Sequence, residues 1–162
     1  MNILRLHLWL ILVLCAAFAT RVLADEPVPK PATFKASIGG FFGSTYRVEL
    51  QDGTLRYTKT QPGGQKPKTE TVTPTPEQWR AFREALDEVK VWKWKKDYIN
   101  SSVADGTQWA LEITYADHTL KTRGSNSYPD DAGEPSAKPD PTKAFARYLQ
   151  AVEKLLGGKS FQ

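Results

Sequence analysis

Residues 91–98 (VWKWKKDY) combine aromatic and basic side chains in a pattern typical of a ligand-binding surface. If this segment is extended, Trp92 and Trp94 project from one side of the backbone and the neighbouring lysines project from the other. Indole rings stack on sugar rings or bases, and lysine side chains attract anions. Trp92, Trp94 and Tyr98 are therefore candidate ligand-binding residues. The competing interpretation, which we favour, is an extended strand or crossover that buries both indoles, because a core without disulfides needs large apolar side chains.

Residues 124–129 (GSNSYP) form a second candidate binding segment. Glycine and asparagine tolerate a left-handed backbone, and asparagine and serine side chains bond nearby amides, so this sequence favours a tight, ordered loop after a strand. Such loops often hold ligands on rigid scaffolds, which makes Asn126 and Tyr128 candidate ligand-binding residues. The alternative, which we again favour, is structural: Tyr128 closes the edge of the sheet and Pro129 ends the strand.

Few residues of the chain could carry catalysis. Asp97 and Asp105 could serve as paired carboxylates in glycoside hydrolysis if the fold brought them within roughly 10 Å, although nothing in the local sequence supports this. His118 lies in or beside a hairpin turn, and a general base needs a partner that orients it. The adjacent Asp117 would point to the opposite face of an extended segment, so we expect a solvated turn histidine. No serine lies in a Gly-x-Ser-x-Gly motif, and we assign no catalytic residue.

The sequence also predicts no metal site and no cofactor. His118 is the only histidine after residue 24, and the single cysteine, Cys15, precedes that point, so the usual zinc ligands are missing from the remaining chain. Acidic residues gather in a proline-containing stretch, but without the spacing around a glycine turn that calcium loops use. We expect a mobile linker there, with acidic residues Asp130, Asp131, Glu134 and Asp140.

The first 24 residues have the pattern of a secretory signal peptide. Arg5 gives a positive start, residues 8–19 (LWLILVLCAAFA) carry no charge, and residues 22–24 (VLA) offer a peptidase site. Twelve apolar residues rise about 18 Å as a helix, well short of the roughly 30 Å of bilayer hydrocarbon. We therefore predict cleavage after Ala24, a periplasmic or secreted protein, and no stable membrane anchor after cleavage.

The chain after Ala24 is close to charge balance. The full chain has a formal net charge of +4, to which Arg5 and Arg21 of the predicted signal peptide contribute. The small remaining excess argues against a nucleic-acid partner. Because no cysteine follows Cys15, an exported chain must be stabilised by burial and main-chain pairing, and its length suits one domain with a sizeable core.

We expect residues 25–44 to form a leader and an irregular segment that leads into the domain. Residues 25–33 (DEPVPKPAT) contain three prolines and no packing pattern, which is typical of an extended, solvated stretch. Residues 34–43 mix aromatic residues with three glycines, and we expect the aromatic side chains to dock on the core without regular structure.

A single domain is expected over residues 45–156, beginning with a first unit over residues 45–89. Alternating apolar side chains predict a hairpin around Asp52-Gly53, and residues 69–73 could add a short third strand. Thr75 and Gln78 form a capping box at the start of a helix. The apolar stripe of this helix comprises Trp79, Phe82, Ala85, Leu86 and Val89.

The second unit, residues 109–156, repeats this plan after a connector over residues 90–108. Alternation predicts another hairpin, and Asp140-Pro141 predicts the start of a second helix. Gly157-Gly158 ends this helix and begins the C-terminal tail, residues 157–162. The fold class is therefore α+β: an antiparallel four- to five-stranded sheet with two helices packed on one face, from a duplicated β-hairpin–helix unit.

The second half carries a recognisable order of motifs. Asp105-Gly106 precedes Trp109 in an alternating strand, and residues 124–129 (GSNSYP) follow. This layout resembles a loose group of uncharacterised exported bacterial domains that share a DG, a tryptophan in an alternating strand and a GxNxYP loop. The resemblance covers about residues 45–156. It implies a single bacterial domain and no established activity.

The function we expect is that of an exported, non-enzymatic module that binds a partner, in the first place another protein. One alternative is a glycan-binding module, with cell-wall sugars stacked on Trp92, Trp94 and Tyr98. A second alternative is a carboxylate-dependent hydrolase built on Asp97 and Asp105. A third is an inhibitor of a secreted enzyme that presents residues 124–129 or the proline-rich loop after them.

Overall fold

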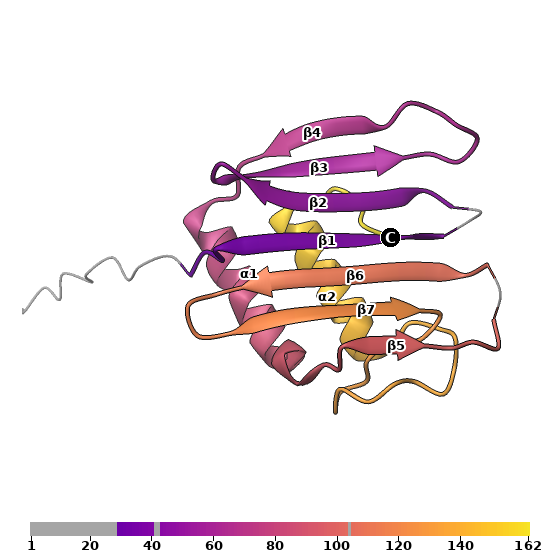
Figure 1. The fold of residues 1–162 in the computed structure, drawn as a ribbon. Coiled ribbons are helices and arrows are strands. Elements are labelled where there is room, and N and C mark those ends of the chain that lie inside the picture. The colour runs from indigo at the N-terminus through magenta and orange to yellow at the C-terminus, as the bar shows by residue number, and fades with distance from the viewer. Residues whose placement is uncertain (1–28, 41–42, 104) are drawn as a thin grey trace, which may run out of the picture.

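The computed structural model describes residues 29–40, 43–103 and 105–162, so the predicted signal peptide (residues 1–24) lies outside the described residues. The described chain forms a sheet with two helices (Figure 1). The strands are β1 (Thr33–Gly40), β2 (Thr45–Gln51), β3 (Thr54–Thr60), β4 (Lys68–Val72), β5 (Asp97–Ile99), β6 (Thr107–Thr114) and β7 (Thr119–Ser125). The helices are α1 (Pro76–Glu88) and α2 (Lys143–Leu155), and a 3-10 turn, η1 (Val91–Lys93), follows α1.

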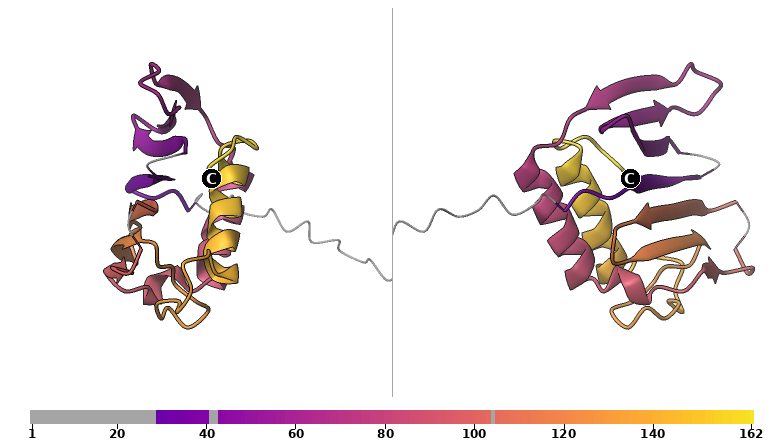
Figure 2. Two further views of the ribbon diagram at one scale, coloured as in Figure 1. Left: turned by 90° about the vertical axis from the view of Figure 1, so that its right-hand side faces the viewer. Right: turned by 60° about the vertical axis from the view of Figure 1, so that its left-hand side comes forward.

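The strands form one seven-stranded sheet in the order β4-β3-β2-β1-β6-β7-β5. Neighbouring strands run antiparallel, except that β5 runs parallel to β7 at one edge. Both helices lie on the same face of the sheet (Figure 2). The α+β class is therefore confirmed, but the predicted antiparallel sheet of four to five strands is wrong in its strand number and in its parallel edge.

Strand β1 is the main departure from the sequence prediction, which makes residues 34–43 irregular. Phe34, Ala36 and Ile38 instead alternate toward the core, and β1 pairs with both β2 and β6. The two predicted hairpins thus join through β1, and the folded domain begins near Thr33 instead of residue 45. Glycine is depleted in strands, so the three glycines of this segment conceal its alternation.

The connector over residues 90–108 is more regular than predicted. Lys90 adopts a left-handed φ of 53°, and η1 follows it directly, so the two tryptophans do not lie along one extended segment. Asp97–Ile99 then forms the edge strand β5. A strand of three residues is too short for alternation to reveal. That the two hairpin–helix units are copies of one ancestral unit remains a prediction.

Helix α1 begins as predicted, whereas α2 begins later than predicted. The Gln78 main-chain N donates to Thr75 Oγ1 (3.3 Å), and the Thr75 main-chain N donates to Gln78 Oε1 (2.8 Å), which completes the capping box. The N-cap of α2 is Thr142 instead of Asp140, and its Oγ1 accepts from the Phe145 main-chain N (3.1 Å). The Thr142 hydroxyl also donates a hydrogen bond to the Pro129 carbonyl, which explains why Thr142 and not Asp140 caps the helix.

The C-terminal tail, residues 157–162, is part of the packed domain. Gly157 and Gly158 have φ values of 69° and 86°, which end α2 as predicted. Beyond them Phe161 is fully buried, and the Ser160 carbonyl accepts a hydrogen bond from the Tyr57 hydroxyl at 2.7 Å. The tail therefore fastens the end of α2 to β3.

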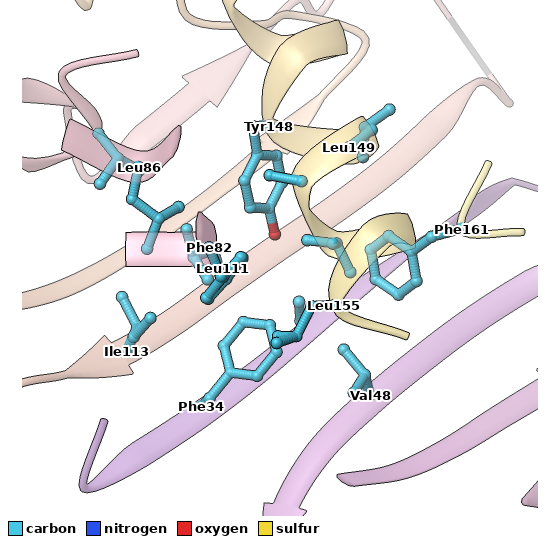
Figure 3. Packing of buried hydrophobic residues seen from close by; sticks show 14 of the residues in the cluster. Phe34, Val48, Phe82, Leu86, Leu111, Ile113, Tyr148, Leu149, Leu155 and Phe161 are labelled. Atoms are coloured by element: carbon cyan, nitrogen blue, oxygen red, sulfur yellow. The ribbon is translucent and has the colours of Figure 1, made fainter. Parts of the chain in front are cut away.

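The hydrophobic core lies between the helices and the sheet. Figure 3 shows Phe34 and Ile113 of the sheet facing Phe82 of α1 and Leu155 of α2. The Phe34 and Phe82 rings meet edge to face, with centroids 5.1 Å apart. Burial of one such side chain contributes about 1.5–3 kcal/mol. In the described part of the chain, neither helix has the length and apolar character needed to cross a membrane.

Candidate functional site

Most of the binding residues proposed from sequence lie in the core. Trp94 is 5% exposed, and its ring contacts those of Trp109, Phe145 and Tyr148. Tyr98 is fully buried, where its hydroxyl donates to the Gly133 carbonyl and accepts from the Lys95 main-chain N, both at 2.7 Å. These aromatic side chains fill the space between β5, β6 and α2 and offer no open platform for a sugar.

Trp92 is partly exposed and belongs to a surface cluster with Arg83, Asp87, Asp117 and His118. The Trp92 indole N donates to Asp87 Oδ1 at 2.5 Å, and its ring stacks on His118 with centroids 4.6 Å apart. The Arg83 guanidinium lies over the Trp92 ring and donates to both carboxylate oxygens of Asp117, at 2.9 and 2.8 Å. The cluster ties the end of α1 and η1 to the turn between β6 and β7.

The geometry at His118 differs from the sequence expectation. The turn brings His118 Nδ1 to 2.8 Å from Asp117 Oδ2, so the two side chains meet instead of pointing to opposite faces. The bidentate hydrogen bonds from Arg83 hold the pKa of Asp117 well below its usual range. Asp117 thus already has two partners, and the groups that surround His118 bond to one another.

The GSNSYP loop is held by contacts that explain its composition. Asn126 is buried in a left-handed conformation (φ 52°), and its Nδ2 donates to the Val103 carbonyl at 3.1 Å. Its Oδ1 lies only 1.6 Å from where a Cβ on Gly106 would be. Tyr128 is buried against Phe145, with ring centroids 4.8 Å apart. Asn126 and Tyr128 therefore have structural roles.

The acidic stretch after this loop is an ordered turn and not the linker predicted. Asp130 Oδ1 accepts hydrogen bonds from the main-chain N atoms of Ala132 and Glu134, both at 2.8 Å. Asp131 pairs with Arg147, and Glu134 pairs with Lys95. Among the described residues, no group of three or more His, Cys, Asp or Glu side chains could hold a metal ion.

The face of the sheet opposite the helices is uncovered, and we call it the open face (Figure 2). Its side chains form rows across the strands, because residues paired by register point the same way. One row alternates in charge and contains two ion pairs, with Lys35 Nζ at 2.8 Å from Glu49 Oε1 and Lys121 Nζ at 3.1 Å from Glu112 Oε2. The hydrogen bond from Lys35 holds the pKa of Glu49 below its usual value. The members of this row are Arg56, Glu49, Lys35, Glu112 and Lys121.

The neighbouring row has a different character. Arg47, Ser37, Ala110 and Arg123 are successive register partners on β2, β1, β6 and β7. Two small side chains thus lie between two arginines. Arg47 makes no hydrogen bond or ion pair with the described residues. Arg123 Nε contacts Asp97 Oδ1 at 2.6 Å.

This row crosses a hollow of about 760 Å³, which we call the trough. Beyond the four residues of the row, the trough is also lined by Ile99 and Asp105. Ile99 is 64% exposed. Among the described residues, it is the one large hydrophobic side chain that is exposed to solvent. The trough therefore combines guanidinium groups, a flat floor and an apolar contact, which is a combination suited to binding.

Asp97 and Asp105, which the sequence suggested as paired carboxylates of a hydrolase, both lie close to the trough. Asp105 has a left-handed φ of 55° and lines the trough, while Asp97 holds Arg123 beside it. Sequence reasoning misses Arg47 and Arg123, because outward charges on strands usually mark solvated positions. Only the recognition of β1 as a central strand would have placed the two arginines on either side of Ser37 and Ala110.

A comparison with models of protein families finds no match for this chain. A comparison with curated proteins likewise finds no similar sequence.

Proposed function

We propose that the chain is an exported, non-enzymatic binding module that binds another protein through the trough on its open face. The observation that carries this proposal is the row Arg47–Ser37–Ala110–Arg123, in which small residues form a floor between two arginines. Arginine is enriched at protein interfaces, and an exposed apolar side chain such as Ile99 is a suitable anchor beside it. In the neighbouring row, Glu49 and Glu112 already pair with lysines, whereas the trough combines two arginines with an exposed apolar side chain.

Two alternatives from the sequence are less well supported. Glycan binding on Trp92, Trp94 and Tyr98 requires open rings, and Trp94 and Tyr98 are buried. A carboxylate-dependent hydrolase would use Asp97 and Asp105; Asp105 lines the trough, but Asp97 is already engaged by Arg123. Reproducible turnover of a cell-wall or peptide substrate that is abolished by Asp97→Asn or Asp105→Asn would favour the hydrolase over the binding module.

Site-specific photo-cross-linking tests the proposal. The photoreactive residue p-benzoylphenylalanine replaces Gln108, which lines the trough, in cells of the organism that encodes the chain. Control positions are Thr119, on the same face but outside the trough, and Glu84 on the exposed side of α1. We expect a discrete protein adduct from position 108 alone, in the exported fraction of the cells. Equal adducts from all three positions, or none from position 108, would contradict the proposal.

A further inference from the structure

The spacing of the two trough arginines indicates what kind of segment the trough binds. Neighbouring strands lie about 4.8 Å apart, so Arg47 on β2 and Arg123 on β7, three strand spacings apart, are separated by about 14 Å at the backbone. An extended peptide advances about 3.4 Å per residue, and its alternate side chains point to the same side. Two side chains four residues apart (i and i+4) in such a segment are therefore also about 14 Å apart, and both point toward the sheet.

The charges of the row favour carboxylates on such a segment. Arg47 has no hydrogen-bonding or ion-pair partner among the described residues, and Asp97 contacts Arg123 only through Nε. The Nη atoms of Arg123 thus keep donors for a second carboxylate, and guanidinium–carboxylate hydrogen bonds are among the strong ones. Ser37 and Ala110 leave room between the arginines for the backbone of the segment.

The remaining lining residues set the limits of such a segment. On β5, Asp97 pairs with Arg123 and Ile99 pairs with Ser125, so Ile99 can contact an apolar side chain two residues after the second carboxylate, which points to the same side of the segment. Asp105 lines the same trough and would repel a carboxylate placed near it. The trough therefore discriminates by the position of negative charge and does not simply attract it.

We propose that the trough binds an extended acidic segment of a partner protein, with carboxylates four residues apart on Arg47 and Arg123 and an apolar residue against Ile99. This inference rests on the proposed function, since it specifies the chemistry of the partner that the trough takes. It does not depend on the identity of that partner.

Three fluorescein-labelled peptides test the inference by fluorescence anisotropy with the purified chain. GEATAEGV has glutamates four residues apart and a valine two residues after the second, GATEAEGV has the same composition with glutamates two apart, and GQATAQGV is neutral. We expect GEATAEGV to bind about tenfold more tightly than the neutral peptide and about threefold more tightly than the respaced one, and its binding to weaken with added salt.

Variants of the chain assign the effect to the two arginines. Arg47→Gln and Arg123→Gln should each weaken binding of GEATAEGV about fivefold, the upper end for an exposed ion pair. Arg56→Gln removes a charge from the same face outside the trough and should leave binding unchanged. Equal affinity for the acidic and neutral peptides, no binding of any peptide at millimolar concentration, or an effect of Arg56→Gln equal to that of Arg47→Gln would overturn the inference. If a cross-linked partner at position 108 is still found, the proposed function survives and only the acidic chemistry is wrong.

Discussion

The indole of Trp109 donates a hydrogen bond to the Ser127 carbonyl at 2.9 Å while its ring lies directly against Gly124. One tryptophan of β6 thus fixes both the end of β7 and the loop that follows it. Asn126 makes the matching contact with Gly106 on the other side of the loop. The DG, W and GxNxYP motifs are therefore parts of one packing arrangement beneath the open face, and they maintain the strand ends that border the trough.

Gly124→Ala should destabilise the domain by about 1–3 kcal/mol, because the added Cβ would lie 2.1 Å from the Trp109 indole N and 2.7 Å from the Ser127 carbonyl oxygen. Urea denaturation followed by tryptophan fluorescence measures this loss in the free energy of unfolding. Gly43→Ala is the matched control, since nothing lies within 4 Å of its added Cβ. Equal stability of the two variants would show that Trp109 can move aside without cost.

Asn126→Ala should cost more than Asn126→Gly. Both variants lose the hydrogen bond from Asn126 Nδ2 to the Val103 carbonyl, worth about 1–3 kcal/mol at a buried site. Only alanine also strains the left-handed backbone at φ 52°, which glycine adopts freely. Denaturation midpoints compare the two variants. A more stable alanine variant would mean that the loop changes conformation when the amide is removed.

The acid sensitivity of the domain should depend on Asp117. Arg83 lowers the folded-state pKa of Asp117 below its ordinary value of 3.8, so the stabilisation by its charge is complete above about pH 3.8. This stabilisation is lost as the pH falls through the lower folded-state pKa. The difference in melting temperature between the wild-type chain and Asp117→Asn should therefore be present at about pH 5 and shrink below about pH 4.

Asp140→Asn is the control for this titration, because Asp140 is an exposed aspartate elsewhere on the surface. Its melting temperature should follow that of the wild-type chain at every pH. A difference for Asp117→Asn that stays constant down to pH 2 would contradict the role assigned to the Arg83–Asp117 pair.

Cell-wall saccharides at millimolar concentration should leave the tryptophan emission of the chain unchanged. Trp94 and Trp109 are buried, and the exposed part of Trp92 is flanked by His118 and Arg83. Fluorescence titration measures this, with Trp92→Phe as the comparison. A saturable shift that disappears in Trp92→Phe would restore the glycan-binding alternative.

Local patterns in the sequence predict the elements whose signals are contained within a few residues. The Asp52-Gly53 hairpin, the capping box at Thr75 and the glycines after α2 all follow from short-range rules, and the structure has each of them. β1 and β5 could not be predicted in this way, because β1 is rich in glycine toward its end and β5 has only three residues. Their partners are set by long-range pairing.

The trough is formed by long-range pairing between strands, which local sequence patterns do not predict. Arg47 and Arg123 are distant in sequence, and they share a row only because β1 enters the sheet between β2 and β6. Conversely, Trp94 and Tyr98 attract attention in the sequence because they are aromatic beside lysines, yet the turn η1 and the strand β5 direct both into the core.

The most direct test of the account is to fill the trough while the photo-cross-linker at position 108 reports on the partner. Ala110→Trp places a large side chain between Arg47 and Arg123, and Thr119→Trp adds the same side chain to the same face outside the trough. The account predicts that the adduct at position 108 is lost in Ala110→Trp and retained in Thr119→Trp, with both variants folded by circular dichroism. An adduct that persists in Ala110→Trp would contradict the claim that the trough is the binding surface.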